Sequence, residues 1–192
     1  SLNTVRIRNF DKTITSIPTS SLITHGVQNW RGMTDTKGRR IKRSISIDIK
    51  TIKFCDELLL KKLAKFVELK DYIVEKKKEI DLDNKQQKIN QDDLIASGLT
   101  NVGLFRQYIF NYLKDHKGIR DDLTFLIRQL QPGQSGLPIE IYVFTNDTDW
   151  VNYENIQSDI FDHLLAVLPA FDLSAFQIIS DNNDQVKRIK DK

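Results

Sequence analysis

Five carboxylates that could bind a cation or act as acid and base lie close together in the second half of the chain: Asp147, Asp149, Glu154, Asp159 and Asp162. Clustered carboxylates can ligate a divalent cation or divide acid and base roles in catalysis. At the start and along the surface of a helix, the same residues act as caps and as solvated charges. The run that begins at Asn146 is typical of a helix start, so it favours the second interpretation.

Histidine and cysteine add little further chemistry. His25, His116 and His163 share no spacing typical of a metal site, and the single cysteine, Cys55, excludes an internal disulfide and a site of several thiolates. We expect Cys55 to be a small buried side chain in an apolar helical stretch. We expect His163 to be a half-buried structural residue on an amphipathic helix.

Motifs for phosphate binding and nucleophilic catalysis are missing from the sequence. The glycines between Gly98 and Gly103 are too sparse for a phosphate loop, and no Gly-x-Ser-x-Gly elbow occurs. The sequence therefore predicts no catalytic residue, no metal and no cofactor. A chain of this kind favours a role in assembly or mechanics over one as an enzyme.

Basic residues are concentrated at the front of the chain. Residues 1–50 contain ten Lys/Arg against three Asp/Glu, whereas residues 122–192 contain five against eleven. The run Arg39, Arg40, Lys42 and Arg43 could contact nucleic acid, but it lacks the interleaved aromatic residues that stack on bases. Proximity to anionic lipid is a second interpretation, and a solvated strand edge protected by its charges is a third.

The first 36 residues predict an incomplete small β domain, and we expect the chain to be part of a longer protein. Apolar and polar residues alternate around 5–7 and 14–17, with a turn at 9–12 in which Asp11 suits a tight bend. Pro18 ends the second strand because proline cannot donate to a sheet ladder. Trp30 and Trp150 stand at element boundaries as packing anchors, and Trp30 could face an interface.

The rest of the chain predicts an α+β domain of ferredoxin-like, split βαβ topology over residues 37–180. Alternation over 39–48 places Ile41, Ile45 and Ile47 on one face of a strand. The further elements expected are helices from 51 to 66, from 67 to 80 and from a cap at Thr100 or Asn101, strands at 122–131 and 137–145 around a turn at 132–136, a helix from 146 to 168, and a strand at 171–179. A helical insertion at about 67–121 extends the first crossover, 81–97 reads as a loop, and 181–192 is a polar tail.

Seven segments in this order resemble the cytoplasmic part of the MscS-like mechanosensitive channels, most closely the miniconductance branch. The segments are 9–19, 29–33, 38–45, 100–103, 136–140, 144–148 and 159–164, and they span most of residues 4–178. The resemblance implies a truncated Sm-like β domain over 1–36 followed by the ferredoxin-like domain. Structural or interface roles are expected for six residues: Asp11, Pro18, Asn29, Trp30, Arg39 and Arg40.

The resemblance also implies a function. The full-length protein would lie in a bacterial inner membrane, with this part in the cytoplasm, and would open under tension to release solutes on osmotic downshock. Its partners would be further copies of itself, seven in all, the transmembrane region of the same chain, and the permeating ions. No nucleic acid is expected as a partner, and the isolated chain is expected to be a monomer or a weak oligomer.

Two other functions stay open from the sequence. A soluble nucleic-acid-binding module would fit the basic front half and a ferredoxin-like domain. A small-ligand regulatory module would fit the fold by analogy alone.

Overall fold

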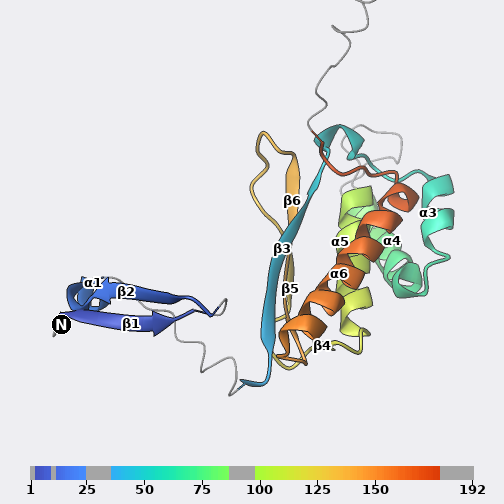
Figure 1. The fold of residues 1–192 in the computed structure, drawn as a ribbon. Coiled ribbons are helices and arrows are strands. Elements are labelled where there is room, and N and C mark those ends of the chain that lie inside the picture. Colours follow the sequence, from blue (N-terminus) through green and yellow to red (C-terminus); the bar gives the residue numbers. More distant parts are fainter. Residues whose placement is uncertain (1–2, 10–11, 25–35, 87–97, 178–192) are drawn as a thin grey trace, which may run out of the picture. The chain divides into compact units, whose positions relative to one another are not determined.

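The computed structural model describes residues 3–9, 12–24, 36–86 and 98–177. The chain forms two compact units, Ser1–Thr36 and Lys37–Lys192 (Figure 1). Among the described residues, no helix has both the length and the apolar character needed to cross a membrane.

The first unit is a β-hairpin followed by a short helix. Strands β1 (Thr4–Arg8) and β2 (Ile14–Pro18) pair in antiparallel register, and α1 (Thr19–Thr24) follows at once. The Asn9 amide organises the turn by donating to the hydroxyls of Thr13 (2.9 Å) and Thr15 (2.7 Å). The predicted hairpin and its end at Pro18 are confirmed, whereas α1 was not predicted.

This hairpin unit has no core of its own among its described residues. None of them is buried, and Ile14 and Ile23 are 60% and 84% exposed. An isolated two-stranded hairpin is marginally stable in water. Asp11, Asn29 and Trp30 lie outside the described residues.

The second unit is built on an antiparallel sheet. Strand β3 (Arg39–Ile47) pairs along its whole length with the central strand β6 (Leu137–Thr145). Two shorter strands, β4 (Ile119–Arg120) and β5 (Leu126–Gln129), share the other edge of β6, and Ile47 forms a bridge with Ala175 beyond β3. Numbered along the chain, β3 is the first strand, β4 and β5 together are the second, β6 is the third and the bridge at Ala175 is the fourth. Across the sheet they lie in the order fourth, first, third, second, which confirms the predicted ferredoxin-like topology.

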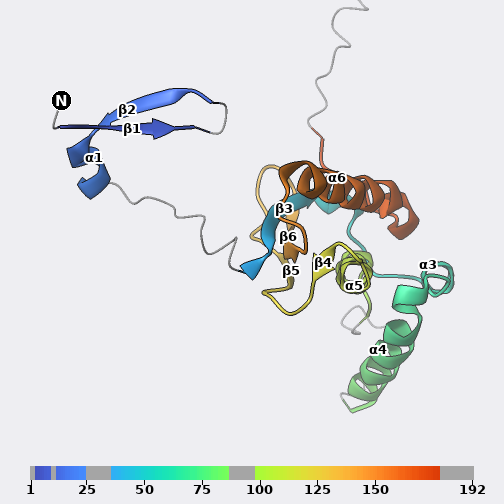
Figure 2. The same ribbon diagram turned by 60° about the horizontal axis from the view of Figure 1, so that its bottom comes forward.

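Helices cover one face of this sheet. Helices α5 (Asn101–Lys114) and α6 (Trp150–Val167) lie on the same side, and their apolar residues meet Ile41, Ile45 and Ile47 in a single core (Figures 1 and 2). Helices α3 (Glu57–Leu63) and α4 (Val67–Gln86) extend the unit beyond α5. No described helix or strand of this unit covers the opposite face.

Four predicted elements differ in their bounds. The helix expected from 51 starts at Glu57, because a 3-10 turn, η1 (Ile49–Thr51), and an extended segment that bridges Phe54 to Thr100 come first. Phe54 and Leu58 are 63% and 78% exposed, so they do not belong to the expected apolar face.

The expected loop at 81–97 begins too early. Residues 81–86 continue α4, since its Lys, Glu and Asp side chains suit an exposed helix despite the weak apolar pattern. The strand expected at 122–131 is only four residues long. The strand expected at 171–179 is wrong at its start, because Phe171 ends a second 3-10 turn, η2 (Leu168–Phe171), and the described remainder contributes a single bridge.

A buried asparagine joins three segments around the start of α5. Thr100 is the N-cap, and its hydroxyl accepts from the Gly103 N–H, while Asn101 is fully buried. The Asn101 amide nitrogen donates to the carbonyls of Thr51 (2.9 Å) and Phe171 (3.1 Å). Its oxygen accepts from the backbone N–H of Lys53 (3.0 Å) and of Val102 (2.9 Å). All four hydrogen-bonding positions of the amide are thus used.

We predict that Asn101→Ala lowers the free energy of unfolding by about 2–4 kcal/mol, because it leaves buried and part-buried backbone groups of two other segments without these hydrogen bonds. Urea unfolding followed by circular dichroism measures the change. Asn155→Ala, at an exposed position of α6, is the control and should stay within about 0.5 kcal/mol of the parent. Equal stability of the two variants would contradict the role given to Asn101.

A second prediction concerns the turn between β5 and β6. Gly136 has a φ of 84°, and a Cβ there would lie 2.3 Å from the Ile47 carbonyl oxygen. Gly136→Ala should therefore cost more than the roughly 1–2 kcal/mol of the left-handed backbone alone. Gly133→Ala, in the same turn but with open space at its Cβ, should be nearly neutral in the same unfolding assay. A neutral Gly136→Ala would show that the turn differs from the one described.

Candidate functional site

The carboxylates near the start of α6 act as caps. The Asp149 carboxylate accepts from the backbone N–H groups of Val151 (2.9 Å) and Asn152 (3.1 Å). Asp147 accepts from the Asp149 N–H (2.8 Å) and the Asn152 amide (2.7 Å), and these bonds lower the pKa of the Asp147 carboxyl. Among the described residues, no group of three or more His, Cys, Asp and Glu side chains could hold a metal ion.

Cysteine and histidine have structural surroundings. Burial raises the pKa of the Cys55 thiol to about 11, and the nearby Asp56 charge adds to this, so the nucleophilic thiolate is scarce at neutral pH. Cys55 is half-buried in the extended segment before α3 rather than in a helix, as its N–H donates to the Leu99 carbonyl (2.7 Å). The expectation of a buried helical residue was therefore wrong in its location.

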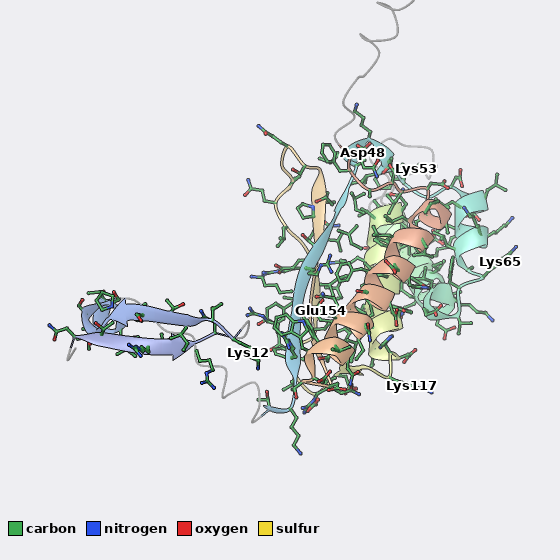
Figure 3. The ribbon with its side chains drawn as sticks, in the orientation of Figure 1. Lys12, Asp48, Lys53, Lys65, Lys117 and Glu154 are labelled. Carbon is green, nitrogen blue, oxygen red and sulfur yellow. The ribbon has the colours of Figure 1, made fainter. Side chains whose placement is uncertain are left out.

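The histidines pack against tyrosines of α5. His163 is exposed overall, yet its ring stacks on Tyr112 with centroids 4.4 Å apart, and its Nε2 lies 2.6 Å from the Tyr108 hydroxyl. Burial lowers the pKa of His116, whose Nδ1 accepts from the Gly118 N–H. A shallow hollow of about 360 Å³ beside His116 is lined by Glu68, Tyr112, Asp115 and Lys117. Figure 3 shows that Lys117 lies at one end of the α/β unit, whereas Asp48 and Lys53 lie at the other end.

The basic run on β3 divides between the two faces of the sheet. Arg39 and Arg43 lie on the helix side, where the Arg39 guanidinium stacks over the rings of Trp150 (4.3 Å) and Tyr153 (4.4 Å). Arg43 lies over the Phe161 ring at 4.5 Å. These contacts fix the start and the middle of α6 against the edge of the sheet. Trp150 is 56% exposed, so it serves as a platform for Arg39 rather than as a buried anchor.

Arg40 and Lys42 project from the opposite, uncovered face. We call this surface the open face. The alternation and register of the three strands place ten residues on it: Arg40, Lys42, Ser44, Ser46, Leu126, Arg128, Pro138, Glu140, Tyr142 and Phe144.

The open face combines aromatic rings, cations and one pinned carboxylate. Tyr142 and Phe144 are half-buried and meet edge to face at 5.9 Å, and Arg40 lies over the Tyr142 ring at 5.6 Å. Glu140 is only 5% exposed, because Arg128 binds it at 2.7 Å and Lys42 approaches to 3.9 Å. The contact of Glu140 with the Arg128 guanidinium is a charge-assisted hydrogen bond, which is stronger than one between neutral groups. After this neutralisation the surface retains an excess of positive charge.

Sequence reasoning missed the aromatic part of the open face. The basic run has no aromatic neighbours in the sequence, since Tyr142 and Phe144 lie about a hundred positions further along the chain. The register pairs Lys42 with Tyr142 and Arg40 with Phe144. The alternation in both strands was visible in the sequence, but only the pairing brings these side chains together.

The described part of the chain is a β-hairpin unit followed by a ferredoxin-like unit with charged and aromatic surfaces, and none of its described His, Cys, Asp and Glu side chains form a group that could hold a metal ion. Residues 41–175 match the family model for the C-terminal region of the mechanosensitive ion channel MscS, and residues 1–32 match that for the mechanosensitive ion channel beta-domain. The chain belongs to the MscS family of mechanosensitive ion channels.

A solved structure supports the fold. The chain is similar to the cryo-EM structure of Arabidopsis thaliana MSL1, with a TM-score of 0.50 and 12% sequence identity. The match covers 93% of this chain and 47% of that one, so the chain spans about half the length of the structure that it matches. At this identity the likeness concerns the fold alone.

We predict that Arg39→Ala lowers the free energy of unfolding by about 1–2 kcal/mol, because it removes two partly exposed cation–π contacts. Arg39→Lys should recover part of the loss, since an ammonium keeps the charge but cannot stack as a plane. Urea unfolding checks both variants, with Ser44→Ala on the same strand as the control. An Arg39→Ala variant as stable as that control would contradict the anchoring role.

Proposed function

We propose that the chain is the cytoplasmic vestibule portion of a mechanosensitive channel that opens under membrane tension and releases solutes on osmotic downshock. The family matches over residues 1–32 and 41–175 carry this proposal. We place the full-length protein in a bacterial inner membrane, as an assembly of seven copies joined to the transmembrane region of the same chain. Helix α4, which lies in the insertion expected at about 67–121, supports the miniconductance branch.

Two features of the structure support a role in assembly. The hairpin unit has no buried residue among those described, so its exposed apolar side chains, such as Ile14 and Ile23, can pack against further protein. On the open face, no described helix or strand covers the half-buried aromatic rings. Pro18, Arg39 and Arg40 are proposed as structural or interface residues, together with Asp11, Asn29 and Trp30.

The charge distribution supports a cytoplasmic position under the membrane. The basic residues of 1–50 would lie near the anionic cytoplasmic leaflet, which attracts Lys and Arg within about one Debye length. The acidic residues of 122–192 would lie further from it. The permeating ions would pass through a vestibule whose wall charges bias their local concentrations.

Patch-clamp recording of the full-length protein, reconstituted in liposomes, tests the proposal. We predict currents that appear with pipette suction and close when it is released, and that are absent from protein-free liposomes. In cells lacking other channels of this kind, its expression should raise survival of osmotic downshock. Correctly inserted protein that conducts nothing under suction up to membrane rupture would contradict the proposal.

A second candidate function rests on the open face. Aromatic rings on a central strand beside basic residues are the arrangement with which some ferredoxin-like domains stack single-stranded RNA. Arg40 already covers the Tyr142 ring, which leaves less of it for a base, so we rank this function second. Salt-dependent binding of a labelled oligonucleotide that is lost in Tyr142→Ala would favour it, and no binding at low salt would exclude it.

A further inference from the structure

We propose that the open face of one copy binds the outer surface of α6 on a second copy, so that the α/β units join head to tail. We define the α6 outer surface as Val151, Asn155, Ser158, Asp159, Asp162 and Leu165. The inference rests on the assembly in the proposed function, and it names the surfaces that make the contact.

The composition of the open face is that of a protein interface. Tyr, Phe and Arg are enriched at such interfaces, and here Tyr142, Phe144 and Arg40 form one contiguous group on neighbouring strands. Leu126, 39% exposed, adjoins this group through its pairing with Tyr142. The rings lie on the central strand β6 towards its C-terminal end, and Lys42 and Arg128 flank the pinned Glu140 beside them.

The α6 outer surface has the complementary charge. Helix α6 contains no Lys or Arg, and Asp159 and Asp162 are exposed and form no ion pair with another described residue. The helical spacing places both acids on one stripe with two apolar residues, Val151 and Leu165, which are 65% and 44% exposed. An acidic stripe with apolar ends can meet a basic surface that includes aromatic rings.

The charges favour a second copy over the two terminal segments of the chain. Residues 1–36 contain four Lys/Arg against two Asp/Glu, and the segment 178–192 contains four against three. Either would bring positive charge to a surface that already has an excess of it. The α6 outer surface brings only negative charge, which steers association and fixes the register.

The geometry makes this contact heterologous. Helix α6 packs with its inner side on the sheet, so its outer surface and the open face point in opposite directions from one α/β unit (Figures 1 and 2). Two different surfaces that bind each other generate a ring or an open chain of copies, rather than a closed pair. Each added copy presents a free open face or a free α6 until the ring closes.

Disulfide trapping tests the contact in the full-length protein. Ser44→Cys on the open face and Ser158→Cys on α6, combined with Cys55→Ser, place one thiol on each surface. Mild oxidation should give a ladder of covalent multimers larger than dimers, whereas each single-cysteine variant should stay monomeric on a denaturing gel. Lys78→Cys on α4, paired with Ser158→Cys, is the matched control and should give no ladder.

Charge reversal tests the same contact without relying on thiol geometry. Arg40→Glu with Lys42→Gln should reduce the yield of the ladder several-fold, and adding Asp159→Lys with Asp162→Lys should restore it. Lys70→Glu with Lys78→Gln changes the net charge equally on α4 and should leave the yield unchanged. Loss of yield in this control as well would overturn the proposal.

Other outcomes of these experiments also test the inference. Dimers from Ser44→Cys alone would mean that two open faces meet, and binding of a single-stranded oligonucleotide to the open face in the intact protein would mean a different occupant. Either result overturns the inference. Tension-gated currents without a ladder would contradict the proposed docking surfaces but not the proposed channel function. A ladder without such currents would contradict the channel function but not the docking surfaces.

Discussion

The α/β unit depends on the fully buried amide of Asn101. This side chain hydrogen-bonds to the backbone at Thr51, Lys53 and Phe171, which belong to segments before α3 and after α6. A buried amide is tolerated only when its donors and acceptors have partners, and here each of them does. The start of α5 is therefore fixed to both ends of the unit, and α5 in turn positions the core against the sheet.

The two faces of the sheet that α5 packs against have different roles. On the helix side, Arg39 and Arg43 lie over rings of α6, so even the charged positions of β3 serve to hold the helix. On the open face, the alternate residues of the same strand meet Tyr142, Phe144 and Glu140. The period of two along a strand thus separates a packing surface from a docking surface.

Much of this fold follows from local patterns. Residues 39–47 and 137–145 alternate over nine positions, and α6 combines an apolar stripe with an Asp149 cap, so both kinds of element were predicted closely. The exposure of Phe54 and Leu58 could not be predicted, because hydrogen bonds to distant residues near Leu99 hold that segment extended. The open face could not be predicted either, since it depends on which strands pair and in which register.

The central claim is that this chain belongs to a channel protein that is anchored in a membrane. The sequence that precedes residue 3 in the full-length gene tests it most directly. We predict two or more apolar spans of about 20 residues, the last rich in small residues and ending just before this chain. A gene that starts near residue 3, or that continues upstream into a polar domain, would contradict the claim.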